Sequence, residues 1–349
     1  MNISALKYIT ILTGPIIGIV SLTMEGWFSW LLPVYSFLLI PFIELFLKTS
    51  SKNYTEMEEN LAKENKNFDY ILYLMVPVQY FSLIYFLFSF HTAQPWYEIA
   101  GKVVSMGVLC GLLGINAAHE LGHRVKPFEQ FLAKALLLTS LYMHFIIEHN
   151  RGHHKNVSTD NDPASSRYGE TIYKFWFRSI IFSFISAWKI EAKELRKKGI
   201  PLFSMKNEMI QFLLIQLAML LLIYFIFGYM VVFYFTGAAL FGIFLLETVN
   251  YIEHYGLRRK KTGENVYERV MPIHSWNSNH PLGRIMLFEL SRHSDHHYMA
   301  SRKYQVLRNF DTSPQLPTGY PGMMLLALLP PLWFKVMHKK IEQVQNLNK

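Results

Sequence analysis

The sequence predicts an all-α integral membrane protein with six transmembrane helices and a histidine-rich helical cap on one side of the membrane. Of the 349 residues, 51% are hydrophobic and only 17% are charged, a balance too apolar for an ordinary soluble domain. Six apolar runs are long enough to cross a bilayer, whose hydrocarbon core of about 30 Å requires about 20 helical residues. Nine of the fourteen histidines gather in four short clusters beside or after these runs.

The apolar runs follow one another in pairs. A tight junction at residues 24–27 separates the first pair, and a short turn at residues 91–97 separates the second. Residues 209–246 carry no charge and would extend about 57 Å as one helix, so we expect Gly228 to divide them into a helical hairpin. No small-residue cleavage site follows the first run, which we therefore expect to be a retained span. The six predicted spans are residues 8–24, 27–47, 70–90, 103–118, 209–227 and 230–246.

Residues 131–147 form a further apolar run, which raises the question of a seventh span. The run is short, carries Lys134 and, as a span, would put the first two histidine clusters on opposite sides of the membrane. We therefore expect a helix packed at the membrane interface or partly below it. Residues 175–188 and 323–333 are too short or interrupted by prolines, and we expect them to be interfacial or re-entrant.

Six spans place both termini on one side of the membrane. The segments on that side, residues 48–68, 119–208 and 250–349, hold nearly all the Lys and Arg, and the positive-inside rule makes this side cytoplasmic. All four histidine clusters lie in the last two segments. Because a shared site needs one cooperative unit, residues 1–349 are expected to form a single domain. The net charge of +9 indicates contact with anionic lipid headgroups rather than nucleic acid, because the basic residues flank apolar runs.

The histidine clusters have the spacing of metal ligands. Imidazoles recur four residues apart, as in His119 and His123, or side by side, as in His153 and His154, where adjacent side chains on a helix diverge by about 100 degrees. Nine imidazoles exceed the capacity of one ion, which predicts two metal ions. Imidazole suits iron, copper, nickel and zinc, so the ligands do not name the metal. The predicted ligands are His119, His123, His149, His153, His154, His254, His293, His296 and His297.

Four carboxylates adjoin the predicted ligands. We expect them to accept hydrogen bonds from ring nitrogens and so to orient the imidazoles, with direct coordination as the alternative. These carboxylates are Glu120, Glu148, Glu253 and Asp295. The five other histidines are isolated in spacing, and we expect them to be structural or to lie outside the ligand set: His91, His144, His274, His280 and His338.

The first cluster also matches a different kind of site. Residues 119–123 read HELGH, an instance of the HExxH pattern in which two histidines bind zinc and the glutamate serves as general base of a metalloprotease. A membrane protease would leave seven histidines at ligand spacing without a role. A metal transporter or store would use histidines as a relay across the membrane, whereas these clusters are predicted on one side. The polynuclear metal centre is therefore the preferred interpretation.

The single cysteine limits the redox chemistry of the chain. Cys110 lies inside an apolar run, which excludes a disulfide framework, a paired-cysteine redox motif and a cysteine-ligated iron–sulfur cluster within this chain. Any electrons that the metal centre needs must therefore come from outside the chain.

The motifs resemble those of the membrane-bound alkane 1-monooxygenases, relatives of the integral-membrane fatty-acid desaturases. Desaturases share the histidine boxes seen here as HELGH, EHNRGHH and SRHSDHH, and the added NYIEHYGL motif at residues 250–257 favours the alkane hydroxylase and xylene monooxygenase branch. DPASSRYGE, HSWNSNH and NFDTSPQLPTGYPGM also match. The chain departs from the usual pattern at Arg124, at Ser291 and at residues 281–284, but no departure removes a ligand.

The resemblance implies a non-haem di-iron centre held by the nine histidines, which inserts one oxygen atom of O2 into a terminal C–H bond of an alkane and reduces the other to water. It further implies electrons from rubredoxin, itself reduced by an NAD(P)H-dependent rubredoxin reductase. The implied location is the bacterial inner membrane, with the histidines on the cytoplasmic side and the apolar substrate arriving through membrane lipid. A xylene or fatty-acyl methyl hydroxylase, or a desaturase of the same superfamily, is the alternative.

Overall fold

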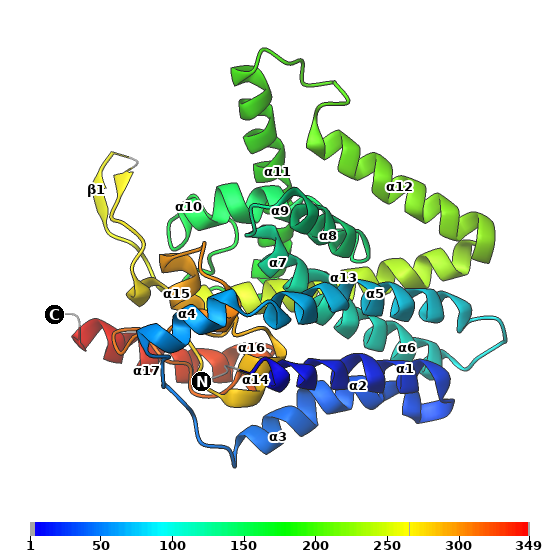
Figure 1. Ribbon diagram of the computed structural model, residues 1–349, viewed down its shortest axis with the longest axis horizontal. Helices are drawn as coiled ribbons and strands as arrows, with labels where there is room; N and C mark the ends of the chain where they lie inside the picture. Colours follow the sequence, from blue (N-terminus) through cyan, green and yellow to red (C-terminus); the bar gives the residue numbers. More distant parts are fainter. Residues whose placement is uncertain (1–3, 265, 348–349) are drawn as a thin grey trace.

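The computed structural model describes residues 4–264 and 266–347. It is mostly helical, and most of its long helices run roughly parallel, with one long helix standing across them (Figure 1). Within the described residues six helices are long and apolar enough to cross a membrane, which confirms the predicted fold class. These helices are Leu6–Thr23, Gly26–Glu44, Asn67–Phe88, Trp96–Gly122, Glu208–Phe227 and Tyr229–His254.

The first two spans are built from short helical pieces joined end to end. Gly26, at a φ of +65°, makes the turn between them. In the second span, Pro41 lacks an N–H, and its ring would clash with the carbonyl of Phe37 in a regular α-helix, so the chain widens there into a π-helix. The pieces of the two spans are η1 (Leu6–Leu12), α1 (Thr13–Thr23), η2 (Gly26–Trp30), α2 (Leu31–Val34), η3 (Tyr35–Leu39) and α3 (Ile40–Glu44).

The third and fourth spans follow α4 (Glu56–Glu64), whose start is closed by a capping box between Thr55 and Glu58. The fourth span continues past residue 118, where the apolar run ends, because the helix persists through the buried polar residues of the first histidine cluster. The elements are α5 (Asn67–Phe88) for the third span, and α6 (Trp96–Leu109), η4 (Cys110–Asn116) and α7 (Ala117–Gly122) for the fourth.

Residues 131–147 do not form a span, as expected. Here α8 (Pro127–Leu138) ends, Leu141 adopts a positive φ of 51°, and the chain turns before α9 (Phe145–Glu148). The second histidine cluster follows on η5 (His149–His153) and α10 (His154–Asn156).

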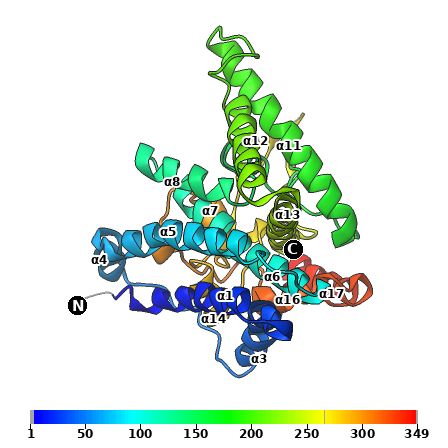
Figure 2. The ribbon, with the colours of Figure 1, turned by 90° about the vertical axis from the view of Figure 1, so that its right-hand side faces the viewer.

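The segment 175–188 lies within α11 (Ile172–Lys197), the helix that stands across the others. The last two spans are α12 (Glu208–Phe227) and α13 (Tyr229–His254), divided as predicted at Gly228, which has a φ of +85°. Figure 2 shows α12 leading back from the projecting end of α11. A methyl group added at Gly242 would lie 2.7 Å from Cβ of Cys110, so this glycine lets α13 approach the fourth span closely.

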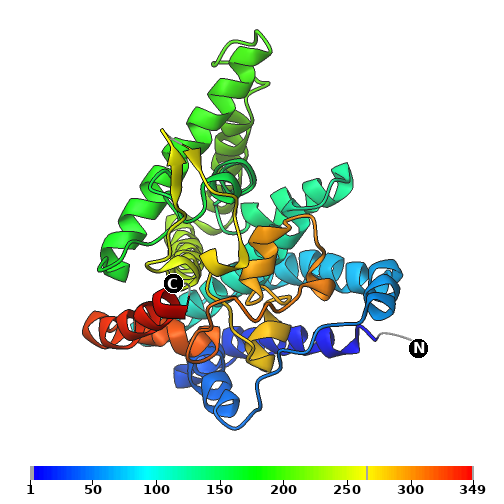
Figure 3. The ribbon, with the colours of Figure 1, turned by 90° about the vertical axis from the view of Figure 1, so that its left-hand side faces the viewer.

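The C-terminal part of the chain lies across the ends of the long helices (Figure 3). It includes one small antiparallel hairpin that the sequence did not predict. Segment 323–333 is divided between two helices just before its prolines and forms no span of its own. The elements are β1 (Lys261–Gly263), β2 (Val266–Tyr267), η6 (Pro272–His274), α14 (Pro281–Met286), α15 (His293–Tyr298), η7 (Tyr304–Val306), α16 (Tyr320–Ala327) and α17 (Pro330–Leu347).

Candidate metal centre

The structure brings the nine predicted ligands together in two groups. Within each group, one ring nitrogen of every imidazole lies within 4.8 Å of a ring nitrogen of each other member. The five-histidine group is His119, His123, His149, His154 and His296. The four-histidine group is His153, His254, His293 and His297.

Helical spacing explains how one short helix serves both groups. In α15, His293 and His297 are four residues apart, share a face and join the four-histidine group, while His296 turns to the other group. The adjacent His153 and His154 separate in the same way, because consecutive side chains on a helix diverge by about 100 degrees. The two groups therefore adjoin, and the rings of His154 and His297 have centroids only 4.5 Å apart.

The ring nitrogens within each group have the spacing of ligands around an ion. Nε2 of His296 lies 3.0 Å from Nε2 of His119 and 3.1 Å from Nε2 of His154. In the four-histidine group, Nε2 of His297 lies 2.9 Å from Nε2 of His293. Two nitrogens bound at right angles, each about 2.1 Å from one ion, stand about 3.0 Å apart. The donor set thus fits a metal ion in each group.

Burial keeps these imidazoles in the form that binds metal. It lowers the pKa of His123 to about 3, with the charges of His153 and Arg124 acting in the same direction. Burial, followed by the neighbouring imidazoles, holds the pKa of five further ligands well below the usual range for histidine: His149, His154, His293, His296 and His297. Neutral imidazoles can coordinate a cation without first releasing a proton.

Asp162 orients one ligand of the four-histidine group. Its Oδ2 lies 2.9 Å from Nδ1 of His153 and accepts a hydrogen bond of 2.5 Å from the Ser165 hydroxyl. Burial, the largest single cause, lowers the pKa of His153, but the charge and hydrogen bond of Asp162 and the charges of Glu148 and Glu247 together outweigh burial and raise the pKa. The contact at Nδ1 leaves Nε2 free to face the group. Asp162 was not among the predicted site residues, although its place in DPASSRYGE was an available signal.

Glu253 lies beside the four-histidine group. Its Oε2 is 3.2 Å from Nε2 of His293, the nitrogen that faces the other ligands, so the carboxylate contacts the inner side of the group. The hydroxyl of Tyr320 donates a hydrogen bond of 2.7 Å to Oε1 of Glu253. Tyr320 was not among the predicted site residues either, although it lies in the NFDTSPQLPTGYPGM motif.

Two predicted carboxylates have other partners. Glu120 forms an ion pair of 2.7 Å with Nη2 of Arg124 and accepts a hydrogen bond from the backbone N–H of Tyr304 at 3.2 Å. Asp295 accepts from Arg302 through both carboxylate oxygens, at 2.8 and 2.6 Å. The expectation that these carboxylates orient imidazoles is therefore wrong for both, because neighbouring guanidinium groups bind them more strongly than a neutral ring would.

The fourth carboxylate, Glu148, is buried, and its Oε1 has no hydrogen-bond partner among the described residues. Burial, followed by the charge of Asp162, raises the pKa of Glu148 to about 8.

The five histidines that were not predicted to be ligands lie outside both groups. For example, His274 contacts Glu268 at 3.2 Å, and His338 bonds the Tyr255 hydroxyl at 2.9 Å.

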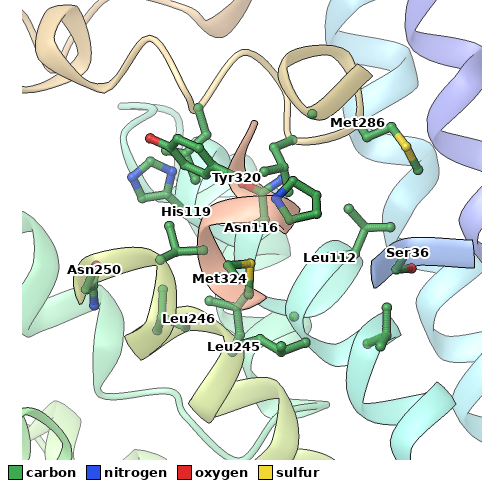
Figure 4. Close-up of a pocket in the computed structure, with 18 of the residues that line it drawn as sticks. Ser36, Leu112, Asn116, His119, Leu245, Leu246, Asn250, Met286, Tyr320 and Met324 are labelled. Carbon is green, nitrogen blue, oxygen red and sulfur yellow. The ribbon is translucent and has the colours of Figure 1, made fainter. Parts of the chain in front are cut away.

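An apolar cavity of about 120 Å³ leads to the histidines (Figure 4). His119, His149 and His293 line it together with Glu253 and Tyr320, and most of the other lining side chains are aliphatic or aromatic. Three π-helical segments border the site: η3 and η4 line the cavity, and η5 carries ligands. Such widened turns are frequent at functional sites.

Comparison with known proteins gives a consistent result. A family model described as fatty acid desaturase matches residues 93–327. The chain is 45% identical over 268 residues to alkane 1-monooxygenase 1 of Pseudomonas aeruginosa, covering 76% of this chain and 70% of that protein. It is 39% identical over 339 residues to alkane 1-monooxygenase 2 of the same organism, covering 93% and 90% of the two chains. The hydroxylase component of a xylene/toluene monooxygenase from Pseudomonas putida is 28% identical over 242 residues, or 69% of this chain and 64% of that protein. The chain therefore belongs to the fatty acid desaturase family, in its alkane 1-monooxygenase branch.

Proposed function

We propose that this protein is an alkane 1-monooxygenase whose nine histidines hold two iron ions. The observation that carries the proposal is the pair of adjoining histidine groups at an apolar cavity. In the reaction, one oxygen atom of O2 enters a terminal C–H bond to give a primary alcohol. The other atom leaves as water, which consumes two electrons and two protons. When bound, the two irons would supply the activation of O2.

The residues of the chain bind and orient the substrate. Most of the cavity wall is aliphatic or aromatic, so an alkane, which has no polar groups, finds mainly apolar contacts there. Two polar side chains of the cavity, Asn116 and Tyr320, lie beside the ligand His119 (Figure 4). An alkane is therefore held with one end at the metal centre, which favours attack on the terminal methyl group.

Electrons come from another protein, for which we propose rubredoxin with its NAD(P)H-dependent reductase. The one cysteine of the chain, Cys110, is buried and belongs to no cluster. His123 and His154 are the partly exposed ligands, and the exposed basic residues Arg151 and Lys155 lie beside His154 in the sequence. These charges suit an acidic donor, whose docking then weakens as ionic strength rises.

We also propose that residues 1–349 act as one domain in the bacterial inner membrane, with the histidine groups on the cytoplasmic side. The lysines and arginines near the ends of the spans support this orientation. The protease alternative loses support, because Glu120 is engaged by Arg124 and Tyr304 and is not available as a general base.

The proposed function is tested with the purified protein in phospholipid vesicles, supplied with iron, rubredoxin, reductase and NADPH. Octane should yield 1-octanol by gas chromatography, and the yield should vanish without rubredoxin. The His254→Ala variant should lose the product, whereas His338→Ala should keep it. The proposal would be contradicted if the protein bound zinc tightly and held no iron, or if it formed no oxygen-dependent product from octane, p-xylene or a fatty acid.

A further inference from the structure

A second, smaller pocket lies beside the apolar cavity, between α11, α13 and the chain around α9. Its volume is about 10 Å³, which is room for about one water molecule. Its wall is mostly polar, unlike that of the cavity, and includes the side chains of Tyr142, His144, Glu148, Ser183, Glu247 and Asn250. We call this space the polar pocket.

The polar pocket adjoins the metal centre. Phe145, His149 and Asn250 line both the pocket and the cavity, so one layer of side chains separates the two spaces. His149 is a predicted ligand of the five-histidine group. Asn250 precedes the ligand His254 by four residues on α13, so the two side chains share one face of that helix.

Glu247 is held in the wall of the polar pocket through both of its carboxylate oxygens. The Tyr142 hydroxyl donates a hydrogen bond of 3.1 Å to Oε1, and the Asn250 amide donates one of 3.2 Å to Oε2. Glu247 is only 2% exposed, and no lysine or arginine pairs with it among the described residues. Ionisable residues within membrane helices commonly serve as proton relays. The pocket thus holds a group suited to taking up and releasing a proton.

Two other residues of the wall have polar atoms that call for a water molecule. Nε2 of His144 and Oε1 of Glu148 are buried and have no hydrogen-bond partner among the described residues. The ring of His144 is fixed by edge-on contacts with Tyr142 and Phe184, with centroids 4.4 and 5.1 Å away. Buried polar atoms are normally bonded to protein or to ordered water, and a buried water typically makes about three hydrogen bonds. The polar pocket offers that number of partners.

The buried face of α11 leads from the polar pocket to the protein surface. Ser179, Ser183, Ala187 and Glu191 recur on this face at intervals of four residues. At its far end, Glu191 forms an ion pair of 3.4 Å with Arg151, whose side chain is 46% exposed. Small and polar side chains therefore continue from the pocket to a residue that contacts water.

We propose that the polar pocket binds a water molecule and, together with Glu247, conducts protons from the aqueous surface to the metal centre. The proposal rests on the proposed function for the reaction that consumes the protons. Each turnover converts an alkane, O2, two electrons and two protons into an alcohol and water, so two protons must reach the oxygen atom that leaves as water. Glu247 releases a proton through the bound water toward the cavity and regains one from the α11 side, which restores its starting state.

The bound water is detected by X-ray hydroxyl-radical footprinting of the full-length, iron-loaded protein in phosphatidylcholine vesicles. Radicals formed from a bound water oxidise the aromatic side chains beside it, and an unirradiated sample corrects for oxidation by iron. We expect Tyr142 to be oxidised although it is only 3% exposed, whereas Tyr251, which is fully buried outside the pocket, should not be. Ser183→Val, which fills the pocket, should protect Tyr142. An unlabelled Tyr142 in the wild type would overturn the proposal.

A kinetic test uses Glu247→Gln, which keeps the size of the side chain but cannot exchange a proton. We expect kcat for octane to fall about 100-fold, while KM, iron content and melting temperature stay near wild type. The ratio of kcat in H2O to kcat in D2O should rise, which a merely structural role of Glu247 would not cause. Ser183→Val should change both quantities in the same direction.

The matched control is Thr236→Val, on the same helix as Glu247, because the Thr236 hydroxyl bonds only the Val232 carbonyl of that helix, at 2.8 Å. This variant should behave as wild type. A Glu247→Gln protein with an unchanged kcat or an unchanged solvent isotope ratio would refute the relay. Footprinting needs no turnover, so a wild-type protein that is labelled at Tyr142 but oxidises no alkane would refute the proposed function and leave the water site standing.

Discussion

Nδ1 of His153 lies 2.9 Å from Oδ2 of Asp162, and both side chains are almost completely buried. The carboxylate fixes which ring nitrogen faces the four-histidine group and holds the ring in place. A histidine ligand is commonly oriented in this way, and the loss of such a partner weakens metal binding without removing a ligand.

The Asp162→Asn variant should therefore bind iron more weakly in the four-histidine group. We expect the affinity of that group to fall between about 10-fold and 100-fold, with the fold retained. Iron titration of the metal-free protein measures the change. Asp160→Asn is the matched control, because Asp160 is largely exposed and its ion pair with Arg258 is long, at 3.9 Å. Unchanged iron binding in Asp162→Asn would refute the orienting role.

Loss of one ligand should affect one group more than the other. His123→Ala removes a ligand from the five-histidine group, and His254→Ala removes one from the four-histidine group. We expect each variant to retain about one iron per chain, because the other group keeps its full donor set. Metal analysis of both proteins checks this, with His338→Ala as a control that keeps both ions. Two irons in either ligand variant would show that the grouping is incorrect.

The length of alkane that the enzyme accepts should depend on the part of the cavity that lies far from the ligand histidines. Val108 lines the cavity and precedes His119 by three helical turns, roughly 16 Å along the span. A larger side chain there shortens the space open to an extended chain. Val108→Phe should lower the yield from hexadecane about tenfold relative to that from octane, as measured by gas chromatography. Leu217→Phe, on the exposed face of α12, should leave the ratio unchanged.

Stability at low pH should depend on Glu289, which joins the first span to α14. Its carboxylate accepts hydrogen bonds from Nε of Arg284 and the Tyr8 hydroxyl, each at 2.7 Å, and from Lys7 at 3.0 Å. Burial favours the neutral form, but the charges of Arg284 and Lys7 prevail and lower the pKa of Glu289 to about 2. The stabilisation is complete above the unfolded-state pKa of about 4.3 and is lost as pH falls from there toward 2.

Glu289→Gln should accordingly destabilise the protein by about 3 kcal/mol at neutral pH and by roughly half of that at pH 3. Thermal melting in detergent at the two pH values measures the difference. The exposed Glu342→Gln should show no such difference. If Glu289→Gln lowered the stability of the protein equally at both pH values, the loss could not come from the ion pairs of the Glu289 carboxylate.

The sequence was sufficient to predict the long helices, because a bilayer imposes a length and an apolar composition that few other structures share. Gly228 was identifiable as the hinge for the same reason: an uncharged run of twice the needed length must turn. The ends of the fourth and sixth spans were harder to predict. There the helix continues into buried polar residues, so the apolar run in the sequence ends before the helix ends.

Ligand spacing identified the histidines that the structure gathers, but it could not assign them to groups. That division depends on how α7, α10, α13 and α15 meet in space. The carboxylates show the limit most clearly. Adjacency in sequence suggested Glu120 and Asp295, whereas the contact to His153 comes from Asp162, nine residues further along the chain. The cavity likewise combines residues from distant helices, which no local pattern reveals.

Mössbauer spectroscopy of the purified protein, loaded with enriched iron and active on octane, tests the central claim most directly. Five imidazoles surround one site and four surround the other, so we predict two distinct iron signals of equal area. A single signal, or an active protein with iron in only one environment, would contradict the claim that the two histidine groups each hold an iron ion.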